Sequence, residues 1–173
     1  MKNLHLPILT AFALVVSLFE SVIPIPVPIP GAKLGLSNMV ILTCLVVFGL
    51  KDSLIISIFK SILLMFMTGS VTSFFYSFAG ALTSALVMYL AYRYLSKYLS
   101  LIGVSLLGAF SHNLSQVSVA AIMLTNARIF SYLPVLTIMS IFTGFFVGLS
   151  SKYLTRALFK NKYIMGNKNE NKG

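Results

Sequence analysis

Residues 133–154 have the sequence LPVLTIMSIFTGFFVGLSSKYL, and this stretch decides the fold class. Lys152 is its only charged residue. A helix that crosses the hydrocarbon core of a membrane needs about 20 predominantly apolar residues, which this stretch supplies. Because the run is continuously apolar and does not alternate with polar residues, it favours a helix over a strand of a closed barrel. The stretch therefore predicts a transmembrane helix.

Five segments that precede it in the chain have a similar character. We expect these spans at Leu6–Ile23, Leu34–Leu50, Ser53–Val71, Phe74–Tyr92 and Leu101–Thr125. Over all 173 residues, 58% are hydrophobic and 9% are charged, which is more apolar surface than one water-soluble core of this size hides. We therefore predict an all-α, polytopic membrane protein, with a single domain of six transmembrane helices over residues 1–160. Residues 161–173 are rich in Asn and Lys and are expected to form a disordered, basic cytoplasmic tail.

The basic residues predict the orientation in the membrane. The chain has 13 Lys and Arg against 3 Asp and Glu, a balance that in a soluble protein would suggest nucleic acid. Here these residues lie mainly between apolar runs, so we expect no nucleic-acid partner, and short basic loops stay in the cytoplasm. With the N-terminus inside, the cytoplasmic side collects Lys2, Lys51, Arg93, Lys97, Lys152, Arg156, Lys160, Lys162, Lys168 and Lys172. Lys33 and Arg128 fall outside and Lys60 within the membrane. We expect a multi-pass protein of the cell membrane, with both termini cytoplasmic and a tail that favours anionic lipid headgroups.

Small residues on the first expected helix point to close helix packing. Ala13 and Ser17 are four residues apart, a spacing that lets membrane helices approach closely. The spacing is compatible with packing inside the bundle and with docking on a separate membrane subunit. The sequence leaves both interpretations open.

A proline-rich loop follows the first expected helix. Residues 24–30 have the sequence PIPVPIP, which cannot be helical throughout because alternate positions lack a backbone donor. On the predicted topology this outer loop is either a lid over a ligand pocket or a rigid connector. Lys33 and Asn38 come next, at the start of the second expected helix, where free N–H groups and the helix dipole favour an anion.

Two ionisable residues lie inside expected spans. A Lys at the centre of a membrane helix costs about 2.5–3.5 kcal/mol on insertion scales, so Lys60 suggests a functional role. Glu20 lies near the outer end of the first span. It is expected to cap a pocket from above or to form an internal ion pair with Lys60 or Lys33.

The fifth expected helix has the densest group of polar residues. Within SHNLSQ at residues 111–116, His112 and Gln116 are four apart, and Asn113 and Gln116 are three apart, so one helix face presents an imidazole and amides. Hydrogen bonding between helices is one interpretation. We favour a binding site, with Arg128 at its outer end as a ligand contact or an interface anchor.

Several kinds of chemistry have no motif in the sequence. The chain has one carboxylate within its expected spans and so cannot assemble the aspartate clusters that hold Mg²⁺ in prenyl transfer. It has no P-loop and no cluster of metal ligands, and the single cysteine is expected to be a packing residue. We therefore expect no catalysis by this chain alone, no metal and no cofactor.

The combination of these elements resembles a known family. It comprises Glu20 with the proline run, GAKLGLSN at residues 31–38, and residues 103–116 with their GVS, GA and HNxxQ elements. The sequence is similar to the bacterial membrane family labelled heptaprenyl diphosphate synthase component I, also called the Gx transporter family. Its architecture resembles the S components of energy-coupling-factor (ECF) transporters. These six-helix proteins capture vitamins or related molecules and dock on a transmembrane subunit driven by ATPases. Ser17 departs from the Ala-xxx-Ala pair typical of those components.

These observations predict a substrate-binding membrane subunit for a small anionic, isoprenoid or cofactor-like molecule. The expected ligand-binding residues are Glu20, Lys33, Asn38, Lys60, His112, Asn113, Gln116 and Arg128. The expected partners are an ECF transmembrane subunit with its ATPases or a soluble prenyl synthase. The alternative is a non-catalytic accessory subunit of a polyprenyl diphosphate synthase or redox system. A third hypothesis is an autonomous proton-coupled carrier that uses Glu20 and His112.

Overall fold

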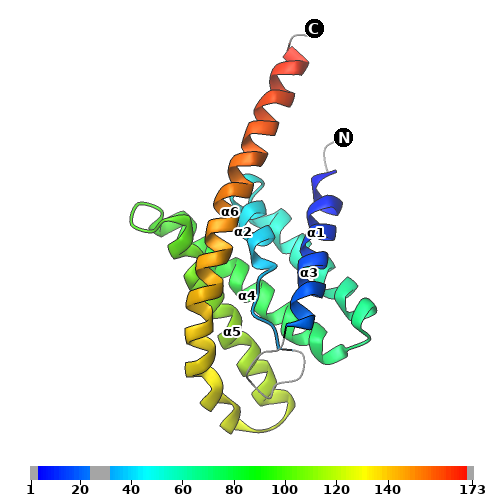
Figure 1. Ribbon diagram of the computed structural model, residues 1–173, viewed down its shortest axis with the longest axis vertical. Coiled ribbons are helices and arrows are strands. Elements are labelled where there is room, and N and C mark those ends of the chain that lie inside the picture. Colours follow the sequence, from blue (N-terminus) through cyan, green and yellow to red (C-terminus); the bar gives the residue numbers. More distant parts are fainter. Residues whose placement is uncertain (1–3, 24–31, 171–173) are drawn as a thin grey trace.

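The computed structural model describes residues 4–23 and 32–170, with side chains to residue 160. These residues form helices joined by short irregular segments, and they contain no strand. The elements are α1 (His5–Val22), α2 (Asn38–Val47), α3 (Leu50–Thr68), α4 (Val71–Leu95), α5 (Leu101–Met123), the 3-10 helix η1 (Ala127–Tyr132) and α6 (Leu133–Glu170) (Figure 1). The all-α prediction is confirmed. The proline run at residues 24–30 lies outside the described residues.

Within the described ranges, 3 stretches are long and apolar enough to cross a membrane: His5–Val22, Val71–Leu95 and Ala127–Lys160. α2 has 10 residues and spans about 15 Å, roughly half of the hydrocarbon core. α3 and α5 are longer but contain the charged and polar residues noted in the sequence. The helices are those of a membrane protein, and the arrangement of six spans stays a prediction.

α5 packs between α4 and α6, α1 packs against α3, and α2 contacts α3 and α6. Small residues bring these helices together, as expected where lipid supplies no hydrophobic driving force. A Cβ atom added to Gly148 of α6 would lie 2.6 Å from the Cα atom of Ile102 in α5. Close contact of the backbones therefore sets the spacing of α5 and α6.

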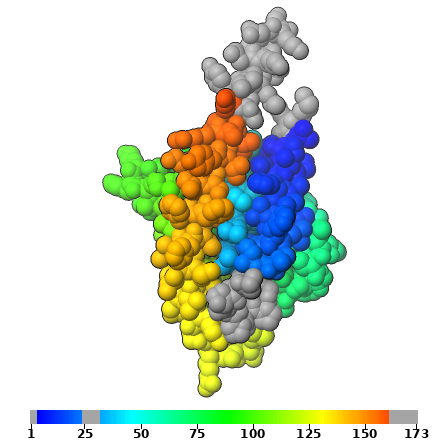
Figure 2. All heavy atoms as spheres, in the orientation of Figure 1, coloured from blue at the N-terminus to red at the C-terminus, as the bar shows by residue number. Residues whose placement is uncertain are grey.

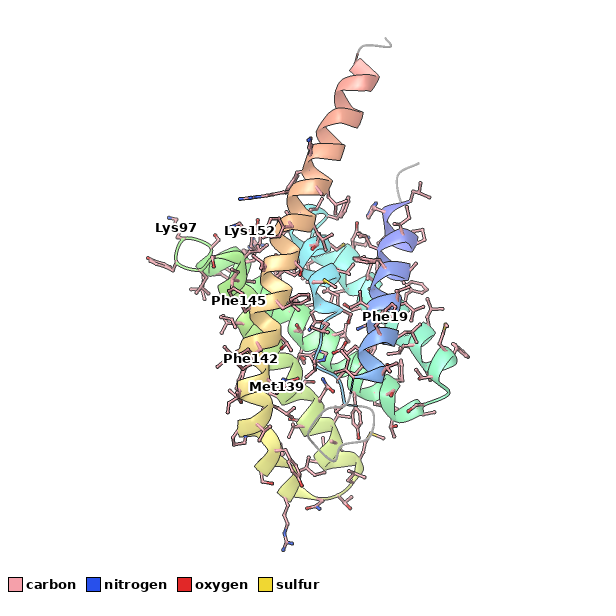
Figure 3. The ribbon with its side chains drawn as sticks, viewed as in Figure 1. Phe19, Lys97, Met139, Phe142, Phe145 and Lys152 are labelled. Atoms are coloured by element: carbon pink, nitrogen blue, oxygen red, sulfur yellow. The ribbon has the colours of Figure 1, made fainter. Side chains whose placement is uncertain are left out.

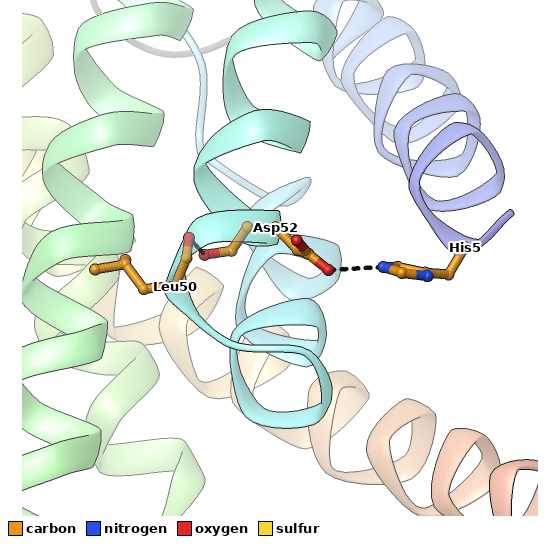
Figure 4. Close-up of polar contacts among 4 residues, drawn as sticks. His5, Leu50 and Asp52 are labelled. Carbon is orange, nitrogen blue, oxygen red and sulfur yellow. Dashed lines mark hydrogen bonds and ion pairs between the residues drawn. The ribbon is translucent and has the colours of Figure 1, made fainter. Parts of the chain in front are cut away.

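The start of α1 and the end of α6 lie at the same end of the bundle (Figure 1). At this end, His5 Nε2 is 2.7 Å from Asp52 Oδ2 (Figure 4). The His5 ring also stacks on Phe48, with ring centroids 4.0 Å apart. These contacts join α1 to the start of α3. This arrangement of the start of α1 and the end of α6 is compatible with an even number of crossings. The number of crossings and the cytoplasmic location of that side stay predictions.

Two helix boundaries differ from the sequence-based expectation. α2 begins at Asn38, not Leu34, because residues 32–37 form irregular chain whose peptide groups bond elsewhere. α6 continues past Leu154 to Glu170, into the predicted disordered tail. Residues 161–170 contain no proline, so nothing in the backbone interrupts the helix. The single transmembrane domain over residues 1–160 stays a prediction.

Candidate functional site

The irregular segment 32–37 is held inside the bundle by a side chain from α5. The Lys33 N–H donates to Gln116 Oε1 at 2.8 Å, and Gln116 Nε2 donates to the Lys33 carbonyl oxygen at 2.7 Å. Both bonds are buried. Non-helical backbone away from water is tolerated only where its polar groups find partners. Gln116 therefore has a structural role in closing this segment onto α5.

Glu20 of α1 supports the same segment from the other side. Its Oε1 atom accepts hydrogen bonds from the Gly35 N–H and, at 3.2 Å, from the Leu36 N–H. Gly35 has a φ of +82°, in the left-handed region that favours glycine, which turns these two donors toward one carboxylate. The anion expected ahead of α2 is thus the protein's own Glu20. Its second oxygen, Oε2, is buried and has no hydrogen-bond partner.

Two buried lysines face this region. Lys33 Nζ donates to Ser21 Oγ at 2.6 Å and to a carbonyl of α1 at 3.2 Å, while Lys60 Nζ donates to Ser37 Oγ at 2.9 Å. An ammonium group has three N–H donors, and in the described structure Lys60 uses one of them, for Ser37. Both cations attract Glu20 through space, but in the described structure neither donates a hydrogen bond to it. Two buried amino groups and one buried carboxyl group therefore meet in this region.

The His112 ring fits between two glycines. A Cβ atom added to Gly80 would lie 2.6 Å from His112 Cε1, and one added to Gly35 would lie 3.0 Å from His112 Cδ2. Asn38 Nδ2 is 3.3 Å from His112 Nδ1. With the Asn38 amide nitrogen as donor, Nδ1 accepts and Nε2 bears the proton. His112 Nε2 and Asn38 Oδ1 are buried, and neither has a partner among the described residues.

Six of the predicted ligand-binding residues therefore meet around segment 32–38. We call them the central polar cluster: Glu20, Lys33, Asn38, Lys60, His112 and Gln116. Asn113 lies on the side of α5 that faces α6, where it donates to the Leu136 carbonyl at 3.0 Å and to Ser140 Oγ at 2.8 Å. Arg128 is exposed in η1 and lies apart from the cluster. Ligand binding by these residues stays a prediction.

Sequence reasoning missed Ser37 and Gly80. Ser37 Oγ accepts a hydrogen bond from the Lys60 ammonium group, and the missing side chain of Gly80 leaves space for the His112 ring. Both residues are small and common in membrane helices, and neither is marked by its spacing to the polar residues. Their roles can be identified only from the way α2, α3 and α4 pack together in the tertiary structure.

The small pair on α1 points into the bundle. Ala13 and Ser17 are both 0% exposed, and Ala13 packs against α2 and α3. This arrangement favours the internal-packing interpretation over partner docking. The outward face of α1 is instead apolar and includes the exposed Phe12. Phe19 lies on the same helix and is also exposed (Figure 3). Phe142 and Phe145 give α6 a similar outer face, suited to contact with lipid (Figure 3).

One comparison with known proteins gives a match. A protein-family model described as heptaprenyl diphosphate synthase component I matches residues 9–154, a range that contains the whole central polar cluster. No curated protein and no solved structure matches the chain.

Proposed function

The chain belongs to the heptaprenyl diphosphate synthase component I family, and we propose that it is a non-catalytic membrane subunit that binds a small anionic or amphiphilic molecule. The proposed site is the central polar cluster. The role would be similar to that of an S component, which captures its substrate and relies on partner subunits for energy.

The burial of two lysine side chains near a single carboxyl group is the observation that carries this proposal. Removing charges from water is costly unless they are compensated, and among the described residues Glu20 is the acidic group near Lys33 and Lys60. A bound anion would balance the second cation. The unpaired atoms Glu20 Oε2, Asn38 Oδ1 and His112 Nε2 also favour a polar occupant, because each unpaired buried group costs about 1–3 kcal/mol.

The test compares two lysine variants of the same helix. Lys60→Met removes the buried ammonium, while Lys51→Met makes the same change at an exposed position and serves as the control. The chain has no Trp, but its single cysteine, Cys44, is fully buried, so a thiol-reactive fluorophore reports unfolding on heating. Native mass spectrometry of gently extracted protein shows whether a small molecule is bound.

We expect native mass spectrometry to detect a bound small molecule in the wild-type protein and in Lys51→Met, but not in Lys60→Met. The unfolding temperatures of the wild-type protein and of Lys51→Met should also be higher than that of Lys60→Met. If both variants retain the molecule equally, the central polar cluster is not its binding site. Uptake that requires ATP and a second complex supports the S-component role. Uptake into vesicles that contain this chain alone would replace that role with an autonomous carrier.

The family match favours a second candidate function. Its description implies partnership with another component of the synthase. If that component is a soluble prenyl synthase, this chain would be its membrane-anchored accessory subunit. This function predicts that affinity-tagged chain isolated from its native membranes carries prenyl diphosphate synthase activity. If the isolated chain lacks this activity but still binds a small molecule, the second function is excluded and the first is supported.

A further inference from the structure

A second candidate site lies at the start of α5, away from the central polar cluster. A cavity of about 280 Å³ is lined by Ser100, Leu101 and Ile102 at the start of α5 and by Lys152, Thr155 and Arg156 of α6. A water molecule occupies about 30 Å³ of liquid, so the cavity has room for a considerably larger group. Its lining places two cations opposite one helix terminus.

The charges around this cavity share one sign. Lys152 and Arg156 are four residues apart and therefore lie on one face of α6. Ser100 caps α5 by accepting the Gly103 N–H. The N–H groups of Leu101 and Ile102, which come before it, have no intrahelical acceptors because they lie in the first turn. The positive end of the α5 dipole adds to the two cations. The nearest charges therefore favour an anion with several acceptor oxygens.

Thr155 gives an independent indication of a ligand. It is 8% exposed, it lines the cavity, and its hydroxyl has no hydrogen-bond partner in the described structure. Thr137 and Ser140 of the same helix each donate to the carbonyl four residues earlier, at 2.8 Å. Thr155 makes no such bond. A buried donor is thus left free beside a cavity that already favours an anion.

Exposed tyrosines on neighbouring segments favour a position of this cavity near lipid headgroups. Tyr94 is 69% exposed, Tyr98 84% and Tyr153 63%. Tyrosines with an apolar ring and a polar tip are enriched where membrane meets water. The end of α4 projects beside the orange part of α6 (Figure 2), and Lys97 and Lys152 lie at a similar level (Figure 3). On the predicted topology this is the cytoplasmic surface.

We propose that this cavity binds the terminal phosphate or diphosphate of an amphiphile whose hydrocarbon chain lies in the membrane. Lys152 and Arg156 neutralise the phosphate charge, and the Thr155 hydroxyl and the first N–H groups of α5 donate to its oxygens. The apolar side chains of Leu101 and Ile102 begin the contact with the hydrocarbon chain. Both an anionic phospholipid and a prenyl diphosphate carry this chemistry.

The experiment uses the full chain in a maltoside detergent, which has no phosphate, with the Cys44 fluorophore as the readout. The probes are phosphatidylglycerol, geranyl diphosphate and, as the phosphate-free control, geraniol. Lys152→Gln removes one cation, whereas Lys97→Gln removes an exposed cation that does not line the cavity. Thr155→Val removes the hydroxyl at nearly constant volume, and Thr155→Ser keeps it.

We expect at least one of the two phosphate probes to raise the unfolding temperature of the wild type, while geraniol does not. Stabilisation by phosphatidylglycerol indicates that the ligand is an anionic phospholipid. Stabilisation by geranyl diphosphate indicates that the ligand is a prenyl diphosphate. Lys152→Gln and Thr155→Val should weaken binding by about tenfold, which corresponds to one lost charged hydrogen bond. Thr155→Ser and Lys97→Gln should bind like the wild type.

Three results would overturn the proposal. They are equal stabilisation by geraniol, an equal loss of binding in Lys97→Gln, and the absence of stabilisation by both phosphate probes. Because Lys152 and Arg156 are exposed, their substitution leaves the core intact. Lys60→Met should leave this binding unchanged, so failure at the central polar cluster and failure at this cavity are separable.

Discussion

Replacing Gln116 by Met should strongly destabilise the protein. The variant keeps a side chain of similar volume but removes the bonds of 2.8 and 2.7 Å that pair the Lys33 N–H and carbonyl. A buried group left without a partner costs about 1–3 kcal/mol, so two groups cost about 2–6 kcal/mol. Side-chain hydrogen bonds between membrane helices average only about 0.6 kcal/mol, because the broken partners find others. In segment 32–37 no helical ladder offers a replacement, so we expect a loss of at least about 2 kcal/mol.

The assay is equilibrium unfolding in mixed micelles of increasing denaturing detergent, read by labelling of Cys44. Ser118→Ala is the matched control on α5, because the Ser118 hydroxyl donates only to the Leu114 carbonyl of its own helix, at 2.8 Å. This control should change the free energy of unfolding by less than about 0.5 kcal/mol. If Gln116→Met costs no more than the control, the Lys33 peptide groups do not depend on Gln116.

Three further predictions concern the cluster and the topology. Gly80→Ala places a Cβ atom 2.6 Å from His112 Cε1 and should lower the free energy of unfolding by about 1–3 kcal/mol. In a double-mutant cycle, His112→Ala should relieve most of this loss, and simple additivity would contradict the contact. Glu20→Gln leaves the two buried lysines uncompensated and should cost on the order of 3 kcal/mol. Adding Lys60→Met should recover part of that loss in the same unfolding assay. Reporter domains fused to either chain end should both signal from the cytoplasm, and signals from opposite sides would contradict the six-span topology.

The sequence alone determined the class of the protein and the identity of most cluster residues. Continuous apolar runs predicted helices, and the expected fifth span at residues 101–125 agrees closely with α5 at residues 101–123. Polar side chains at depth were recognisable because lipid cannot satisfy them. The helical spacing of His112 and Gln116 placed them on one face before any tertiary contact was known. These inferences need only composition and local periodicity.

Only the tertiary structure decided which group each polar residue contacts. Gln116 pairs with the Lys33 peptide, 83 positions away in the chain, and this contact explains why α2 starts at Asn38. The packing of α1 likewise turned Ala13 inward, and the unpartnered hydroxyl of Thr155 is visible only beside the start of α5. Local sequence sets where a side chain projects from its own helix. Its partner depends on how separate helices pack, which rests on many small contacts that no single stretch of sequence contains.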